Sequence, residues 1–199
     1  MSRHRRLAPV LLACALAALG PATAEAACGG VEQERPRADH NLGRAPIAIG
    51  DSALLGALPQ VASVGIRANA RGCRQYPEGL ALMRELRSQD RLPRVVILEL
   101  GSNGYVTQDN IDDALNIVGK RGIVALVTPR EAAGVGTHDI ELIRREAHEH
   151  RRVRLLDWVR FSAGHSAWFQ PNGLHLTFDG ADAMARLFSQ VFRWLPNPR

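Results

Sequence analysis

Short apolar runs that alternate with segments of helical spacing most constrain how this chain can fold. The runs are continuous rather than alternating, which is typical of strands buried on both faces of a parallel sheet. The segments between them repeat apolar side chains every three or four residues, as amphipathic helices do. The predicted strands are 45–49, 61–64, 94–100, 123–128 and 153–158, and the predicted helices are 78–86, 109–118, 140–147 and 181–194.

This alternation of strands and helices predicts a single α/β domain. We expect a flavodoxin-like three-layer α/β/α sandwich with a five-stranded parallel sheet over residues 44–199. A polar segment without periodicity, 27–43, is expected to be an N-terminal extension. Ligands of such sheets bind at the carboxyl ends of the strands, so residues that directly follow the apolar runs are the candidates for function.

Residues 1–26 have the features of a secretory signal peptide. Three arginines precede an apolar run over 7–19, and small residues in A-x-A spacing follow up to Ala26. The run is too short for an ordinary membrane-spanning helix, and no later segment qualifies. Cleavage after Ala26 predicts an exported protein, secreted, periplasmic or held in the cell envelope, with no membrane span after processing. A retained N-terminal anchor is the alternative.

Charge and cysteine content fit such a protein. The chain carries a formal net charge of +5, and residues 1–26 contain three arginines and one glutamate, so the remainder is mildly basic. Its arginines are scattered along the sequence, which argues against nucleic-acid binding. Cys28 and Cys73 invite one disulfide in an oxidising compartment, with two unpaired buried thiols as the alternative. No metal or organic cofactor is suggested, and we expect a monomer.

Four residues that follow predicted strands or precede the last helix suggest nucleophilic chemistry. Ser52, in Gly-Asp-Ser, follows the first strand, where a helix N-terminus favours developing negative charge. Gly65 follows the second strand and Asn103 the third; a backbone N–H and an amide there can donate to an oxyanion. His175 precedes the last helix and is the candidate base for a serine hydroxyl. Each residue alone is more typical of an ordinary turn or a structural position than of a catalytic site.

In this order the four residues closely resemble the SGNH (GDSL-type) hydrolase family, over about residues 45–195. Gly-Ser-Asn-Gly is most similar to the SGNH domains attached to integral-membrane acyltransferases that act on cell-envelope polysaccharides. The resemblance implies acyl transfer through an acyl-Ser52 intermediate, with His175 as base. It also implies an oxyanion hole made by the Ser52 N–H, the Gly65 N–H and the Asn103 side chain. The implied substrates are O-acyl esters, such as O-acetyl groups on envelope glycans, with water or a sugar hydroxyl as acceptor.

One position departs from the family's pattern. Its last block usually reads Asp-x-x-His, and here Asn172 stands in place of the aspartate that orients the histidine. In serine proteases the equivalent loss costs on the order of 10⁴ in turnover. Three outcomes are open: a Ser–His dyad oriented by Asn172 or a backbone carbonyl, a substitute carboxylate from Asp157 or Asp179, or a domain without catalysis that binds carbohydrate or acts as a scaffold.

Overall fold

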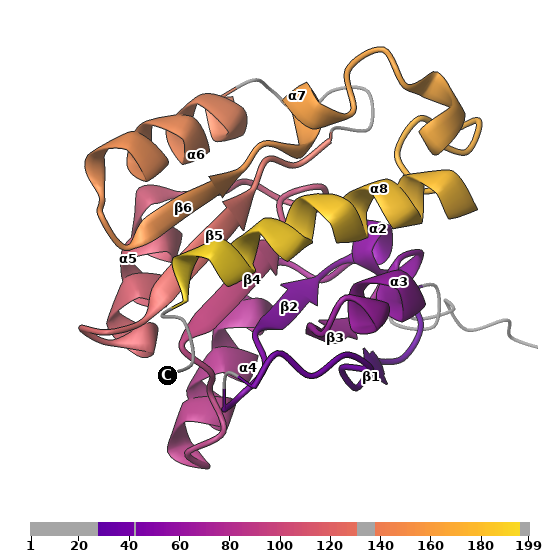
Figure 1. The fold of residues 1–199 in the computed structure, drawn as a ribbon. Coiled ribbons are helices and arrows are strands. Elements are labelled where there is room, and N and C mark those ends of the chain that lie inside the picture. Colours follow the sequence, from indigo (N-terminus) through magenta and orange to yellow (C-terminus); the bar gives the residue numbers. More distant parts are fainter. Residues whose placement is uncertain (1–27, 42, 131–137, 196–199) are drawn as a thin grey trace, which may run out of the picture.

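A computed structural model describes residues 28–41, 43–130 and 138–195 of the chain. Within these residues the strands form one six-stranded sheet in the order β1-β3-β2-β4-β5-β6, with helices on both faces (Figure 1). Five strands are parallel, and β1 pairs antiparallel with β3 at one edge. The predicted three-layer fold is confirmed, with one strand more than expected. The strands are β1 (Glu32–Glu34), β2 (Ile47–Gly50), β3 (Arg67–Ala70), β4 (Val95–Glu99), β5 (Ile123–Val127) and β6 (Val153–Leu156).

The helices divide between the two faces of the sheet because each strand buries alternate side chains on opposite sides. One layer contains α2 (Ser52–Leu55), α3 (Leu58–Ser63), α7 (Trp158–Phe161) and α8 (Phe178–Phe188), followed by the 3₁₀ helix η2 (Ser189–Trp194). The other contains α4 (Tyr76–Ser88), α5 (Gln108–Val118) and α6 (His138–Glu149). The short 3₁₀ helix η1 (Ser166–Trp168) contacts α8.

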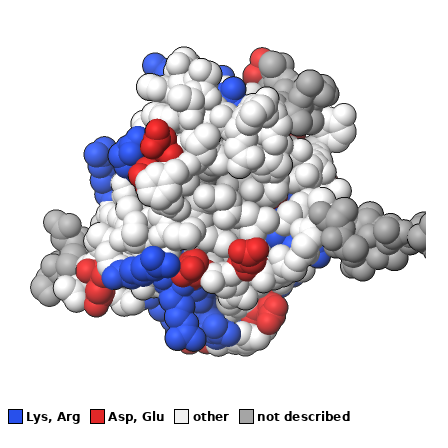
Figure 2. All heavy atoms as spheres, turned by 90° about the vertical axis from the view of Figure 1, so that its right-hand side faces the viewer, with Lys and Arg blue, Asp and Glu red and all other residues white. Residues whose placement is uncertain are grey.

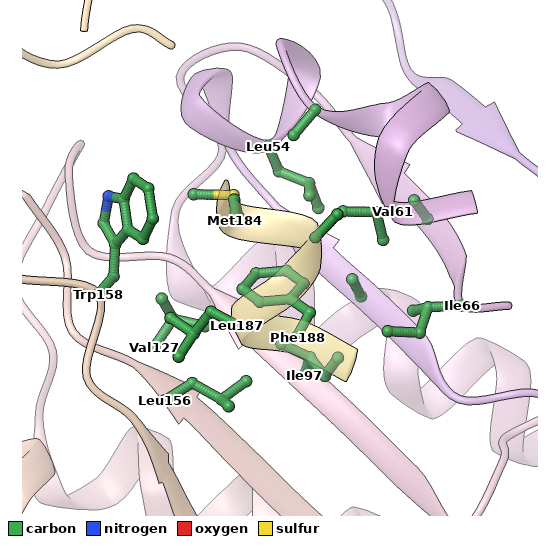
Figure 3. Close-up of a cluster of buried hydrophobic side chains, with 14 of the residues drawn as sticks. Leu54, Val61, Ile66, Ile97, Val127, Leu156, Trp158, Met184, Leu187 and Phe188 are labelled. Carbon is green, nitrogen blue, oxygen red and sulfur yellow. The ribbon is translucent and has the colours of Figure 1, made fainter. Parts of the chain in front are cut away.

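The core beneath α8 explains why this helix lies across the sheet. Met184, Leu187 and Phe188 project from it among Leu54, Ile97, Val127 and Trp158, as Figure 3 shows. The strands present small side chains to this layer, including Ala48, Ala68 and Ala125, so the helices can approach closely. Phe188 has no exposed surface, and truncating such a side chain to alanine typically costs about 3–5 kcal/mol.

The predicted strand over 61–64 is wrong. These residues belong to α3, which buries Leu58, Val61 and Ala62 at helical spacing. A four-residue apolar window does not distinguish a strand from a buried helical turn. The actual strand, β3, reads Arg-Ala-Asn-Ala and contains no apolar run that would predict it.

The segment expected to be an extension belongs to the sheet. Within it, β1 pairs with β3 between Glu32 and Ala70 and between Glu34 and Ala68. Cys28 and Cys73 lie at bonding distance, with their sulfurs 2.18 Å apart. The predicted signal peptide, 1–26, lies outside the described residues. None of the helices in the described ranges is both long and apolar enough to cross a membrane.

Replacing Cys28 and Cys73 by serine should lower the free energy of unfolding by about 3–4 kcal/mol, because the bond closes a loop with a sequence separation of 45. Urea unfolding under oxidising conditions measures this difference. Reductant should lower the stability of the wild type to the same extent and leave the double variant unchanged. A wild type insensitive to reductant would contradict the expectation.

Candidate active site

The turn that carries Ser52 connects β2 to α2 at the carboxyl edge of the sheet. Gly50 ends the strand, Asp51 caps the helix, and Ser52 is its first residue, half-buried. A Cβ on Gly50 would lie 2.6 Å from Leu54 Cβ and 2.8 Å from Glu99 Oε2, so only glycine fits. Because the first N–H groups of a helix lack intrahelical acceptors, the Ser52 N–H points out of α2 as a possible donor to a ligand.

The Asp51 carboxylate joins this turn to the one after β4. It has no exposed surface and accepts hydrogen bonds from the Ala53 N–H, at 3.0 Å, and from the Ser102 hydroxyl. Asn103 Nδ2 donates in turn to Ser102 Oγ at 3.3 Å. The structure therefore brings Asn103, which the sequence places in the oxyanion hole, next to the Ser52 turn.

A second buried carboxyl group lies behind Asp51. The Asp51 N–H donates to the Glu99 backbone oxygen at 3.1 Å and lies 3.4 Å from Glu99 Oε2. Burial, and then the charge of Asp51, raise the pKa of Glu99 well above its ordinary value. Burial also raises the pKa of Asp51, but the hydrogen bonds from Ser102 and Ala53 oppose that rise. Glu99 therefore holds the proton of the pair and Asp51 carries the charge.

His175 lies in a loop that packs beside α2. Phe169 and Leu176 form a β-bridge, and the Gln170 N–H donates to the His175 carbonyl at 2.8 Å. A Cβ on Gly56, just past α2, would lie 3.7 Å from Leu176 Cβ. The loop thus lies at the edge that carries Ser52, although within the described residues Ser52 and His175 share no hydrogen bond. Catalytic hydrogen bonds are often long without substrate.

Arg130, which follows β5, fixes the far side of this loop. Its Nε donates to the Gly173 carbonyl at 2.6 Å, and its guanidinium lies 3.8 Å from the centre of the Phe169 ring. The end of β5 therefore holds the histidine loop in place.

Asn172 occupies the orienting position next to His175. Its Oδ1 accepts from the N–H groups of Leu174, at 3.1 Å, and His175, at 3.0 Å. This leaves Nδ2 facing His175 Nδ1 at 2.7 Å. Since an amide nitrogen only donates, His175 Nδ1 accepts in this arrangement, and the proton of the neutral ring lies on Nε2.

Asp157 and Asp179 are the two carboxylates that could substitute for the aspartate that Asn172 replaces. Asp157 caps α7, pairs with Arg144 at 3.0 Å and accepts from Thr128 Oγ1 at 3.1 Å. Burial by itself would raise the pKa of Asp157, but these hydrogen bonds and the Arg144 charge hold it below its ordinary value. Asp179 is exposed in the first turn of α8. Neither carboxylate bonds to His175 among the described residues.

The expectation that Gly65 contributes to the site is wrong. Gly65 precedes β3, so it lies at the amino end of that strand, where a Cβ would contact the His40 ring. The length of β3, about 3.3 Å per residue, separates it from the edge that carries Ser52. Gly72 follows β3 at the correct edge, and its neighbour Arg71 donates its N–H to the Gly50 carbonyl at 3.3 Å. Because the second strand was predicted at 61–64 and not at Arg67–Ala70, Gly72 was not recognised as a residue that follows a strand.

Metal ligands are not assembled at this edge. In the part of the chain that the structure describes, no group of three or more His, Cys, Asp or Glu side chains could hold a metal ion.

Glu99→Gln should stabilise the protein near neutral pH. With its folded-state pKa raised above the ordinary 4.5, the folded protein retains a proton that the unfolded chain releases, so stability falls as the pH rises above that value. Urea unfolding at about pH 7 should show a higher free energy of unfolding for the variant than for the wild type, and the difference should be smaller at about pH 4. The exposed Glu85→Gln is the matched control. A folded Glu99 variant less stable than wild type at neutral pH would refute the assignment.

Sequence relatives and solved structures both include O-acetyltransferases. No family model matches the chain. The Bacillus subtilis protein named "Putative peptidoglycan O-acetyltransferase YrhL" is 32% identical over 149 residues, which are 74% of this chain and 23% of that protein. The O-acetyltransferase OatA of Staphylococcus aureus is 36% identical over 94 residues, 46% of this chain and 15% of that protein. The chain thus spans less than a quarter of the length of these relatives.

Solved structures show the same fold. The C-terminal catalytic domain of the Streptococcus pneumoniae peptidoglycan O-acetyltransferase A superposes with a TM-score of 0.67 at 20% identity, covering 78% of this chain and 97% of that domain. A lipase/acylhydrolase from Enterococcus faecalis gives a TM-score of 0.58 at 16% identity, covering 78% and 99%. By its fold the chain is similar to these solved structures and to a putative SGNH hydrolase from Slackia heliotrinireducens (TM-score 0.59, 16% identity, 75% of this chain and 98% of that chain), and in sequence it is similar to part of the O-acetyltransferases named above.

Proposed function

We propose that the protein is an exported SGNH enzyme that transfers acyl groups through Ser52. One observation carries the proposal: the histidine loop packs beside α2, so that Ser52 at its first position and His175 share one edge of the sheet. The Asn103 side chain is tied to the same turn through Ser102 and Asp51.

The reaction has two halves. His175 Nε2 takes the proton from Ser52 Oγ while this oxygen attacks the carbonyl carbon of an ester. The oxyanion is held by the Ser52 N–H, the Asn103 amide and, in place of Gly65, the Gly72 N–H. Collapse breaks the bond to the alcohol oxygen, which leaves with the proton from His175. Water or a sugar hydroxyl then gives its proton to His175 and attacks the acyl carbon; the bond to Ser52 Oγ breaks, and His175 returns the proton to this oxygen.

Asn172 slows this chemistry. His175 needs a lone pair at Nε2 to accept the serine proton, but the Nδ2–Nδ1 contact favours the tautomer with a proton there. Turning the amide would place Nδ2 against two backbone donors and lose both of their hydrogen bonds. The imidazolium that forms during the reaction would also have Nδ1–H directed at an NH₂ group. We therefore propose an active site with restrained turnover.

The substrate is an O-acyl ester, and we propose an O-acetyl group on a cell-envelope glycan. The names of the relatives support this class, since two of them refer to peptidoglycan O-acetylation. Two exposed aromatic side chains that are close in sequence to site residues support a carbohydrate: Tyr105, 74% exposed, lies two residues after Asn103, and Phe178, 71% exposed, lies three residues after His175. The Cys28–Cys73 pair suits an oxidising compartment outside the cytoplasm.

A second candidate function is a carbohydrate-binding or scaffold domain without catalysis. The Asn172 amide favours it, because this contact stabilises the tautomer that does not accept the serine proton. The aromatic side chains and the fold would serve either function.

Labelling of the purified protein by a fluorophosphonate probe separates the two candidates. An enzyme should be labelled in a time-dependent manner at Ser52, because the probe requires an activated hydroxyl. Ser52→Ala should abolish labelling, whereas Ser63→Ala, which removes an exposed serine, should not. Well-folded wild type that is not labelled would support the binding domain.

Asn172→Asp should raise esterase turnover by at least about tenfold. A carboxylate accepts from both backbone N–H groups and from Nδ1–H, so it favours the catalytic tautomer and stabilises the imidazolium. Hydrolysis of an activated acetyl ester measures the rate, and ¹⁵N chemical shifts of His175 report the tautomer directly. Asn172→Ala is the control for losing the contact without adding charge. A slower, correctly folded Asp variant would contradict this role of Asn172.

A further inference from the structure

Arginines that are scattered along the sequence gather around one groove. It lies between α4 and the strands β1 and β3 and has a volume of about 510 Å³. Four arginines line it together with two glutamates: Arg67, Arg71, Arg74, Arg91, Glu78 and Glu85. Figure 2 shows one face of the molecule on which basic side chains gather in the lower part, with acidic side chains among them. The apparent lack of a basic cluster is thus a property of the sequence order and not of the folded surface.

Several guanidinium donors in this groove are buried without an acceptor. Arg67 Nε and Nη2 and Arg71 Nε have no hydrogen-bond partner among the described residues and almost no exposed surface. Arg74 differs, since it donates to the Gly50 and Asn69 carbonyls and to Asn69 Oδ1. Buried donors are almost always satisfied in folded proteins, so these three nitrogens need an explanation.

The acidic side chains do not balance the arginines. Glu78 pairs with Arg71 at 2.8 Å, and Glu85 accepts from the Gln89 amide at 3.1 Å. Arg67 has no acidic partner in the part of the chain that the structure describes. Burial lowers the pKa of Arg67, and the neighbouring charges of Arg91 and Arg44 lower it further. An anion in the groove would relieve both the unsatisfied donors and this repulsion.

We propose that the groove binds an oxyanion, a carboxylate or a phosphate, carried by an extended ligand. The planar fork of arginine matches either group through paired N–H donors. The groove follows β3 from Arg67, its first residue, to Arg71 and Arg74 beyond its last. Arg74 bonds the Gly50 carbonyl, two residues before Ser52, so one end of the groove lies at the catalytic edge. Binding there does not require the serine chemistry.

Titration calorimetry of the purified protein with three polymers tests the proposal. Polygalacturonate supplies carboxylates, polyphosphate supplies phosphates, and dextran is the neutral control. We expect saturable binding of at least one polyanion and no binding of dextran; the polyanion that binds identifies the source of the oxyanion. If neither polyanion binds, the proposal is overturned.

Matched variants locate the binding. Arg67→Met and the exposed Arg91→Gln should each weaken polyanion binding by roughly tenfold. Arg151 is an exposed arginine next to β6, at the edge of the sheet that is far from β1 and β3. Arg151→Met should therefore weaken polyanion binding less than about twofold. Equal losses in all three variants would mean diffuse attraction and refute the groove. Ser52→Ala should bind like wild type, which separates this test from that of the acyl chemistry.

Thermal melting gives a second readout that a damaged fold would not mimic. Arg67→Met removes a half-buried charge whose Nε and Nη2 have no acceptor among the described residues, so without polyanion the variant should melt at a higher temperature than wild type. The same variant should lose the rise in melting temperature that the polyanion gives the wild type. An Arg67 variant that melts lower and still gains from the polyanion would show that Arg67 is structural only.

Discussion

The buried Asp51 carboxylate holds together two strand ends on which the site depends. β2 and β4 are hydrogen-bonded along their length, but that pairing does not fix the turns that leave them. The carboxylate accepts from Ala53 in one turn and from Ser102 in the other, which sets the start of α2 relative to Asn103. A charge without exposed surface is tolerated here because donors surround it and because Glu99 keeps its own proton. One negative charge therefore fixes the start of α2, at Ser52, relative to the loop that carries Asn103.

The parts of the fold that the sequence predicted are those buried on both faces. β2, β4 and β5 lie inside the sheet and are buried along their whole length, and their continuous apolar runs reveal them. β6, at the edge, is only partly buried and was recognised from Val153, Leu155 and Leu156. β3 was missed because its environment differs on its two sides. Its alanines lie under the α8 layer, where small side chains fit, and Arg67 and Asn69 line the polar groove on the other side. Neither face of β3 therefore requires large apolar side chains, and the strand has no apolar run by which it could be predicted. β1 is a three-residue edge strand with glutamates, which sequence patterns do not distinguish from a loop.

The placement of the candidate site residues in the fold was predictable where it follows directly from their position along the chain. Ser52, Asn103 and His175 were located by their places next to strands or before the last helix, and the structure brings their turns and loop to one edge. Gly65 failed because its place depended on the misassigned strand. The orientation of the Asn172 amide was not predictable either, because it is set by two backbone N–H groups that are neighbours only in the folded loop.

The short strand β1 has a consequence for how the molecule avoids self-association. An open strand edge presents a row of unpaired backbone groups that another chain can extend, and a very short, charged strand covers such an edge without offering a new one. β1 covers β3 in this way, and the bond between Cys28 and Cys73 fastens it there. Without that bond, only the pairing of three residues would hold β1 on β3, so the disulfide contributes to keeping this edge of the sheet covered.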